Sequence, residues 1–486
     1  MHRSISAIVA LLLMSVFKPA EAFSQDSAGA KTVESEEIAR IVGEAMTRDG
    51  AIRFLEILTD RIGGRVTGTA ECRAAAELIL KTLKESGYDN AHFEEYELAS
   101  PWQRGPATAE VVSPVPRALH IGSYGLVPGT PGVIDLPVVD HGPARDDVVL
   151  PQSVRGAAVI VDLRSNGIST TYVGTRANMA RRLAEAGAAA MFIISDKPNR
   201  MVYTSAFLFY PRGPLPVLSI ANEDALFLRR LLAKSAVRIR LNVHNSFGTK
   251  PIQERNVVAD LPGADPSEMV VLSAHFDAWD AAQGANDNGA GVAAILEAAR
   301  IFKSINLRPR HTVRFVFFSG EEQGDLGSVA YAKQHRQELD KIRAVVNYDS
   351  GAQAPQGLQL YGRKDLEETT SKLLRPLAPL GADRVYLDAD FDSDEESFLV
   401  YGVPAYSLKV ENGDYDVRHH TIVDTFEKID PRMLGIDTAV LAIVAYSFAN
   451  AEERPGRRLS STEVQELLKR TGLEPLYRLD YPISPY

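Results

Sequence analysis

The sequence of 486 residues predicts an α/β fold in which helices cover both faces of a central sheet and a mostly β segment is inserted. Two observations predict this class. From about residue 255, apolar strands alternate with amphipathic helices, a pattern typical of a sheet buried on both faces. Between about residues 100 and 245, Pro and Gly are frequent and separate short apolar runs, which indicates β structure joined by turns.

The N-terminus has the pattern of a signal peptide. His2 and Arg3 precede an apolar run over 7–17, and Ala-Glu-Ala follows at 20–22. The run is too short to span a bilayer, and no later segment has the pattern of a membrane span. We therefore expect cleavage after Ala22 and a mature protein that is secreted or periplasmic.

The mature chain begins with helices. Two helical patterns lie within 34–60, and a third covers 70–86 and ends at Gly87, before residues 92–98 alternate like a strand. Cys72, the only cysteine, lies in the third pattern. No intramolecular disulfide can form, and we expect this thiol to be a small buried apolar group rather than a nucleophile.

Strands and helices continue through the rest of the chain. In the mostly β segment we expect a buried strand at 157–163 and then a helix that stops at Gly187 before another strand. In the α/β region we expect strands at 269–275, 311–319 and 342–349, and helices at 289–303 and 325–335. The last helix occupies 460–472, where Ser460 and Glu463 match a capping box and Gly472 marks the stop.

Side chains that bind metals follow the strands of the α/β region. Open α/β sheets bind ligands at the carboxyl ends of their strands, so these residues are expected to converge. They are His275, Asp287, Glu321, Glu322, Asp349 and the pair His419 and His420.

The net charge of −10 disfavours nucleic acid or an anionic membrane surface as a partner.

The chemistry of this set suits zinc. Imidazole and carboxylate ligands bind borderline divalent ions, but the set is too large for one tetrahedral ion with an open position. It fits two ions roughly 3.5–4 Å apart that share a bridging carboxylate and a water. Asp287, in a Gly-rich loop, is the natural bridge. Within the pair Glu321 and Glu322, one carboxylate can coordinate while the other takes the proton of the water.

Four stretches of the sequence, "HFDAWDAAQGANDNGAG", "FFSGEEQGDLGS", "NYDSG" and "HHTIVDT", resemble the co-catalytic zinc exopeptidase family. That family includes zinc aminopeptidases, glutamate carboxypeptidases and glutaminyl cyclases. The resemblance implies a three-layer domain with a mixed sheet between helices, and two Zn²⁺ ions per chain. It also implies that His275 and Asp349 hold one zinc, Glu322 and His420 hold the other, and Asp287 bridges them.

The resemblance also implies the catalytic groups. Glu321 would be the general base and later the acid that protonates the leaving amine. Asp277 would orient a ligand imidazole, and Asp424 is expected to do the same on the other side. His420 is preferred over His419 because it directly precedes Thr421, as the family ligand precedes a hydroxyl residue.

The mostly β segment resembles a protease-associated domain through "GAAVIVDL" and "ANMARRLAEAGAAAMFIIS". Such an insertion would cap the cleft or shape substrate access, or serve as an inert structural unit. The expected organisation is a signal peptide at 1–22, a first catalytic part at 34–110, the insertion at 111–245, the main catalytic part at 246–450, and a C-terminal helix and tail at 451–486.

The expected function is a zinc metallo-exopeptidase that hydrolyses short unblocked peptides, as a dipeptidase or carboxypeptidase. Three alternatives stay open: a zinc aminopeptidase on longer peptides, an acyltransferase like glutaminyl cyclase with one zinc, and a binding protein without catalysis. The resemblance allows for a homodimer.

Recognition of a free terminus needs charged groups. An amino group needs carboxylates, and a terminal carboxylate needs Arg, Lys or backbone N–H groups. The acidic candidates are Asp390, Asp392, Asp394, Glu395 and Glu396, and the basic candidates are Arg363 and Arg418. Tyr348, Tyr401 and Tyr415 are candidates for stabilising the oxyanion.

Overall fold

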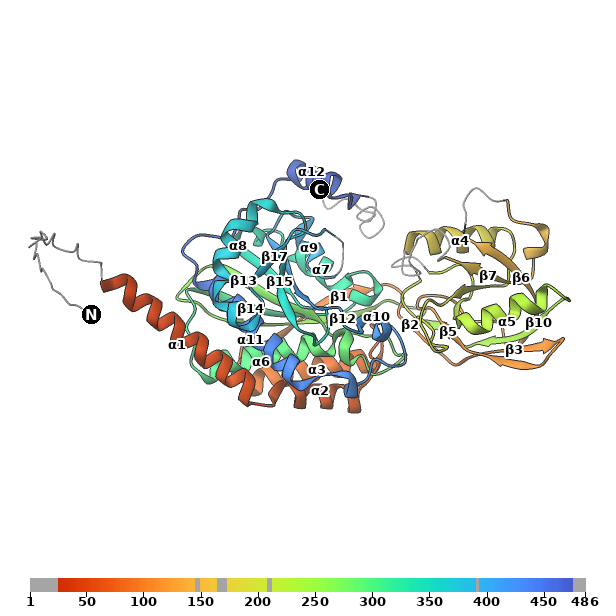
Figure 1. Ribbon diagram of the computed structural model, residues 1–486, viewed down its shortest axis with the longest axis horizontal. Helices are drawn as coiled ribbons and strands as arrows, with labels where there is room; N and C mark the ends of the chain where they lie inside the picture. The colour runs from red at the N-terminus through yellow and green to blue at the C-terminus, as the bar shows by residue number, and fades with distance from the viewer. Residues whose placement is uncertain (1–24, 145–148, 164–172, 208–211, 390–392, 475–486) are drawn as a thin grey trace, which may run out of the picture.

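The computed structural model describes residues 25–144, 149–163, 173–207, 212–389 and 393–474 (Figure 1). Two eight-stranded sheets dominate the chain. The predicted signal peptide at 1–22 lies outside the described residues. The larger part holds the first sheet and most of the helices, and the second sheet lies to one side of it in Figure 1.

The first sheet is mixed, with strand order β1-β12-β14-β13-β15-β18-β16-β17. Its centre, β14-β13-β15-β18, is parallel, whereas β1, β12 and β16 join antiparallel neighbours. The strands are β1 (His92–Leu98), β12 (Ile252–Leu261), β13 (Asp265–His275), β14 (His311–Phe318), β15 (Ile342–Asn347), β16 (Pro355–Gln359), β17 (Arg384–Tyr386) and β18 (Ala405–Val410).

Helices cover both faces of this sheet. Along β13 the side chains alternate, so that Val270 and Leu272 join one core cluster while Met269 and Val271 join another. The first cluster includes residues of α1 (Gln25–Thr47), α2 (Gly50–Arg61), α3 (Ala70–Glu85), α6 (Ala290–Ser304), α8 (Glu367–Leu373) and α11 (Pro431–Asn450), or side chains packed against them. The second includes residues of α7 (Leu326–Gln334), α9 (Glu396–Leu399) and α12 (Ser461–Thr471). The three-layer α/β prediction is confirmed.

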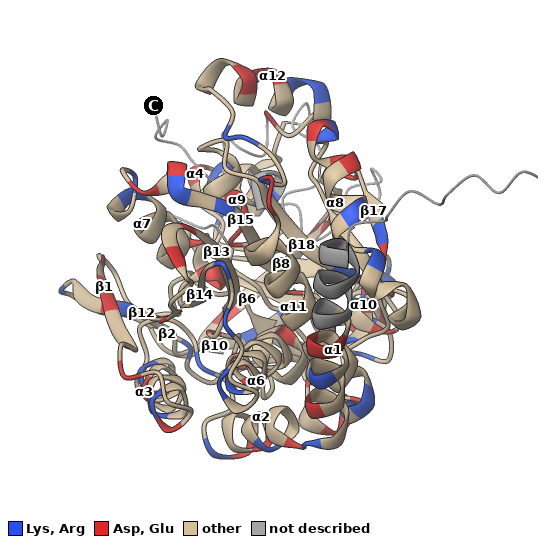
Figure 2. Ribbon diagram, turned by 90° about the vertical axis from the view of Figure 1, so that its left-hand side faces the viewer, with Lys and Arg blue, Asp and Glu red and all other residues tan. Residues whose placement is uncertain are grey.

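The outer helices α3 and α12 carry both acidic and basic residues (Figure 2), and in α12 the basic residues lie in the last turn. The capping box of Ser460 and Glu463 is present at the start of α12, and Gly472 ends that helix with a positive φ of 78°. The helix α11 is long and apolar enough to cross a membrane, but 78% of its most apolar window is buried inside this domain. It forms part of the core of the larger domain.

The second sheet has the order β4-β3-β10-β6-β7-β8-β9-β5. Its strands are β3 (Ala107–Ser113), β4 (Arg117–Leu119), β5 (Ile121–Ser123), β6 (Ile134–Pro143), β7 (Ala158–Asp162), β8 (Ala190–Ile194), β9 (Val217–Ile220) and β10 (Arg238–Val243), with helices α4 (Val173–Glu185) and α5 (Asn222–Leu232). We call residues 107–243 the second-sheet region. It is inserted between β1 and β12, which pair with each other in the first sheet, and a short ribbon of β2 (Trp102–Gln103) and β11 (Ser246–Phe247) connects the two parts.

Trp279 joins the second-sheet region to the first sheet. Its buried ring packs edge-to-face on Trp102, with centroids 6.2 Å apart, and both belong to a cluster that includes Leu126 and Ala206. A Cβ added at Gly125 would lie 2.1 Å from a ring atom of Trp279. Only glycine allows this approach, so the loop that follows β13 is packed directly against the inserted region.

Candidate metal centre

The predicted metal-binding residues converge at the carboxyl ends of the parallel strands. His275 is the last residue of β13, Glu321 and Glu322 follow β14, and Asp349 follows β15. Asp287 lies between β13 and α6. The remaining ligand candidate, His420, follows the short helix α10 (Tyr415–Arg418), and Lys197 of the second-sheet region donates to the carbonyl of Asp416 on that helix. The parallel order of β14, β13 and β15 brings the first four residues to one edge.

The first half of the centre is built around His275. This side chain is fully buried, and its Nε2 lies 3.1 Å from Asp349 Oδ1 and 3.4 Å from Asp287 Oδ1. The other ring nitrogen, Nδ1, lies 3.1 Å from the carbonyl oxygen of Asp277 and 3.5 Å from its carboxylate. If a metal ion binds Nε2, the proton of the neutral ring would be on Nδ1, which faces the two acceptors of Asp277.

The second half of the centre is built around His420. Its Nε2 lies 3.0 Å from Asp287 Oδ2 and 3.0 Å from Glu322 Oε2. The other oxygen of Glu322 accepts a hydrogen bond from the backbone N–H of Trp279. The two carboxylate oxygens of Asp287 therefore face different imidazoles, which is the arrangement that a bridging carboxylate requires.

The backbone around Asp287 is held by Asp424. One oxygen of Asp424 accepts from the N–H of Asn286 at 2.6 Å and the other from the N–H of Asp287 at 3.2 Å. The expectation that Asp424 orients an imidazole is not met, because its carboxylate instead fixes the loop that carries the bridge. Burial, together with the negative charge of Asp287, raises the pKa of Asp424 to about 7.

The carboxyl groups of the centre have pKa values shifted in opposite directions. Burial opposes ionisation of Asp287, but the neighbouring imidazoles of His275 and His420 outweigh it and hold the pKa of that carboxyl well below its usual range. In Glu321, burial and the nearby charges of Asp349 and Glu322 raise the pKa well above its usual range. The carboxylate of Glu321 lies 3.7 Å from His275 Nε2 and is 17% exposed. It is the most accessible carboxylate of the centre.

These residues fit divalent metal ions. His275, Asp287 and Asp349 place ligand atoms within 4.8 Å of one another, as do Asp287, His419 and His420. The buried atoms His275 Nε2 and Asp349 Oδ1 have no hydrogen-bond partner among the described residues. Buried polar atoms without partners are rare, and a bound cation would satisfy both. Imidazole and carboxylate donors match zinc.

His419 lies beside the centre but farther from the bridge than His420. Its Nε2 is 3.6 Å from Asp287 Oδ2, and its ring lies between those of His420, at a centroid distance of 3.8 Å, and Tyr415, at 5.2 Å. Burial, together with the charge of His420, lowers the pKa of His419 well below its usual range. The neutral ring thus packs against the centre.

Where the structure describes them, the terminus-binding candidates from the sequence are paired or buried. Arg363 is buried in an ion pair with Asp365, and Arg418 donates to the carbonyl of Lys428 and pairs with Asp414. Of the acidic run, Asp390 and Asp392 lie outside the described residues. The other three members are buried rather than solvated: Asp394, Glu395 and Glu396.

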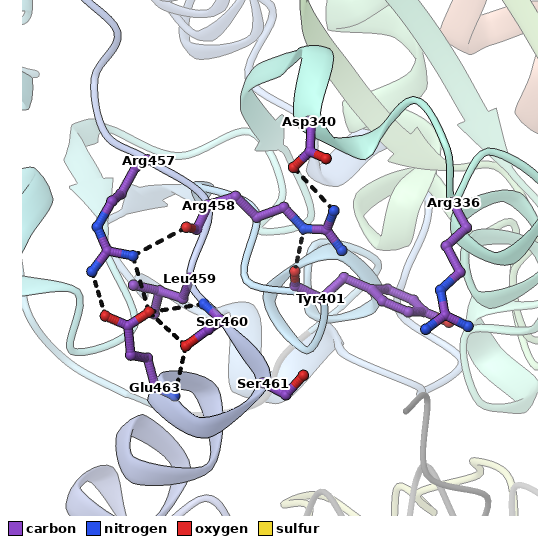
Figure 3. Close-up of a pocket in the computed structure, with 9 residues that line it drawn as sticks. All are labelled: Arg336, Asp340, Tyr401, Arg457, Arg458, Leu459, Ser460, Ser461 and Glu463. Atoms are coloured by element: carbon purple, nitrogen blue, oxygen red, sulfur yellow. Dashed lines mark hydrogen bonds and ion pairs between the residues drawn. The ribbon is translucent and has the colours of Figure 1, made fainter.

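The three tyrosines singled out as oxyanion candidates are also engaged. The hydroxyl of Tyr348 lies near the carbonyl of Gly351 and 2.6 Å from Asp437. Tyr415 stacks on His419. Tyr401 packs against Arg336 and lines a surface hollow of about 430 Å³ at the start of α12 (Figure 3). In that hollow Arg457 pairs with Glu463 and Arg458 with Asp340, so its strongest charges are already neutralised.

Three buried residues escaped the sequence analysis. Arg65 is fully buried and donates to the carbonyls of Phe276, Gln283 and Gly284, which fixes the loop from His275 to Asp287. Tyr203, from the second-sheet region, places its hydroxyl 3.2 Å from His420 Nδ1. Arg176, on α4, is fully buried. None of them lies in a recognisable motif, and only the fold shows their contacts.

Comparison with known proteins gives a consistent result. The model of the family described as "Peptidase family M28" matches residues 256–444. Carboxypeptidase Q of Rattus norvegicus is 30% identical over 416 residues, which span 82% of this chain and 85% of that protein. Carboxypeptidase Q of Homo sapiens is 29% identical over 420 residues, or 85% and 88% of the two chains.

Solved structures with the same fold are also known. A peptidase M28 precursor from Shewanella amazonensis SB2B matches with a TM-score of 0.80 and 26% identity, over 88% of this chain and 99% of that chain. A zinc aminopeptidase from Bacillus subtilis, BSAP, matches with a TM-score of 0.65 over 85% and 98% of the two chains. Its identity of 21% shows similarity of the fold alone.

Proposed function

Because the chain belongs to peptidase family M28, we propose that it is a binuclear zinc exopeptidase that hydrolyses short peptides with free termini. The observation that carries this proposal is the position of Asp287, whose two carboxylate oxygens face two separate sets of ligand atoms. One set is His275 and Asp349, and the other is His420 and Glu322. Each set would hold one zinc ion, with Asp287 shared between them.

Zinc supplies two kinds of chemistry when it is bound in such a pair: it polarises the scissile carbonyl, and it lowers the pKa of water to near neutrality. The remaining work falls to the protein. Glu321 is not needed as a ligand, and its carboxylate is the most accessible of the centre. It accepts the proton of the attacking water and then delivers that proton to the leaving amine.

Asp277 has a supporting role in this proposal. Its carboxylate accepts a hydrogen bond from the hydroxyl of Thr67 at 2.6 Å and faces His275 Nδ1. This holds the imidazole in the tautomer that presents Nε2 to a metal and raises the basicity of the ring. Asp277 and Thr67 are both fully buried, so water does not compete for these contacts.

Arg176 supports recognition of a terminal carboxylate. The side chain is fully buried, and none of its three guanidinium nitrogens has a hydrogen-bond partner among the described residues. Among the described residues no carboxylate pairs with this charge, and a buried charge without an anionic partner is costly, so the site favours an anionic ligand. The guanidinium lies over the ring of Tyr124 at 5.1 Å, Tyr124 packs on Tyr203, and Tyr203 packs on His420. A cationic group thus lies two aromatic rings from the proposed metal ligand.

Blocked dipeptides test this specificity. One dipeptide is offered free, N-blocked, C-amidated and doubly blocked, and we expect cleavage of the free form only. In Arg176→Met, kcat/KM for the free form should fall about 10–100-fold, since a hydrogen bond to a charged group contributes about 1.5–3 kcal/mol. The residual rate on the C-amidated form should not change. Equal cleavage of the free and C-amidated forms by the unaltered enzyme would instead favour an aminopeptidase.

Two alternatives make different predictions. An acyltransferase like glutaminyl cyclase would function with one zinc, whereas the geometry of Asp287 supports two. A binding protein without catalysis would have no use for Glu321, an accessible carboxylate beside two sets of ligand atoms.

We further propose that the signal peptide directs the protein to the periplasm or the exterior, and that the inserted region is a protease-associated domain.

A further inference from the structure

The two proposed imidazole ligands are positioned by different means. His275 ends β13, a strand hydrogen-bonded on both sides, and the carbonyl of Asp277, two residues later, receives its Nδ1. His420 belongs to no strand or helix. It lies in the loop after α10 with φ of 57°, a left-handed conformation that is uncommon for residues other than glycine. Such a conformation persists only where its surroundings hold it in place.

Those surroundings belong to the second-sheet region. The backbone N–H of Thr204 donates to the carbonyl of His420 at 3.1 Å, and the Thr204 hydroxyl lies 3.4 Å from the same oxygen. The neighbouring residue, Tyr203, places its hydroxyl 3.2 Å from His420 Nδ1. Both the backbone and the ring of His420 are therefore held by two consecutive residues of the inserted region.

Tyr203 is itself anchored in that region. Its backbone N–H donates to the hydroxyl of Ser219, a fully buried residue of β9. Its ring is 2% exposed and packs edge-to-face on Tyr124, with centroids 6.3 Å apart. The phenol oxygen is thus fixed relative to the second sheet rather than carried on a mobile side chain.

The two ring nitrogens of His420 face different groups. Nε2 lies 3.0 Å from both Asp287 and Glu322, so it points into the proposed metal site. The proton of the neutral ring then belongs on Nδ1, where the oxygen of Tyr203 accepts it. A partner at this position fixes the tautomer and the orientation of a metal-bound imidazole.

We propose that Tyr203 is a positioning residue for the metal ligand His420, so that the second zinc site is complete only when the inserted region is docked. This inference rests on the proposed function, because it assumes that His420 binds metal. It gives the inserted region a role in the metal centre itself: one ligand imidazole is oriented from the first sheet and the other from the second-sheet region.

Metal affinity tests this role. The metal-free protein and its Tyr203→Phe variant are titrated with Zn²⁺ against a chelating indicator, and with Co²⁺ while the visible spectrum is recorded. We expect one of the two sites to lose about 10–100-fold in affinity in the variant, while the other is unchanged. The Co²⁺ band of the weakened site should shift, and excess zinc should restore most of the activity.

Matched variants separate this role from a general loss of stability. Tyr406→Phe removes another buried phenol, whose hydroxyl lies 3.4 Å from that of Thr370 in the first-sheet core, and both metal affinities should stay unchanged. Ser219→Ala removes only the anchor of Tyr203, so a smaller loss at the same site is expected. If Tyr203→Phe fails to fold, the zinc affinities of Ser219→Ala test the role of Tyr203 instead.

The outcomes distinguish this inference from the proposed function. Two full-strength sites in Tyr203→Phe and in Ser219→Ala would overturn the role of Tyr203 and leave the binuclear enzyme intact. An unaltered protein that binds fewer than two zinc ions would overturn the proposed function itself, and the role of Tyr203 with it.

Discussion

Replacement of Glu321 by Gln is expected to lower kcat by about 10²–10⁴-fold, the range that general acid–base catalysis supplies. The amide cannot accept a proton from water, yet it has nearly the shape of the carboxylate. Because the proposed ligands are other residues, both zinc ions should remain bound. The measurement is kcat on a free dipeptide together with the metal content of the same preparation.

Replacement of the neighbouring Glu322 is expected to have a different effect from replacement of Glu321. Glu322 faces His420 Nε2 at 3.0 Å and is 5% exposed at its side chain, so Glu322→Gln should lose metal as well as activity. Glu368→Gln, at a side chain that is 83% exposed on the outer helix α8, should change neither. Full activity of Glu321→Gln would show that another group is the base. Loss of metal from that variant would make Glu321 a ligand.

Asp287→Ala is expected to cost about 10³-fold or more in kcat, equivalent to about 4 kcal/mol of transition-state stabilisation. Removing one side chain takes a ligand atom from both proposed sites and brings the two metals' positive charges together without the intervening carboxylate. The metal content should fall below two per chain at micromolar free zinc. A variant that keeps two ions and wild-type kcat would exclude Asp287 as the bridge.

Much of the first sheet could be predicted because its strands carry local signals. The runs at 269–275 and 311–319 are apolar and β-branched, and the structure has strands there. Polar residues that end such runs must meet when the strands are parallel, and this brings His275 and Asp349 together. The strand pattern predicted that these residues converge, whereas the pairing of His275 with Asp349 came from the resemblance to the exopeptidase family.

The helix α11 escaped prediction for a physical reason. It is buried on nearly all sides, so its apolar residues do not repeat at the helical period that marks an amphipathic helix. The same lack of a local signal hid the contacts of Arg65 and Tyr203. Arg65 donates to the carbonyl of Phe276, which is 211 residues away, and Tyr203 is 217 residues from His420. Contacts at such separation are properties of the fold.

The position of Asp424 shows a further limit of sequence reasoning. Its carboxylate lies four residues after His420, and a role beside that imidazole was a reasonable expectation. The structure turns it toward the backbone of Asn286 and Asp287 instead. Spacing along the chain predicted that Asp424 lies near the centre, but the turn after His420 decides which group it contacts.

Zinc titration of the metal-free protein tests the central claim most directly. Bound zinc and hydrolysis of a free dipeptide are measured in the same samples as zinc is added. If Asp287 bridges two metal sites, full activity requires two equivalents of zinc per chain. A chelator should then abolish the activity, and added zinc should restore it. Full activity at one equivalent, with no further gain at the second, would contradict a binuclear centre and would indicate a mononuclear zinc peptidase.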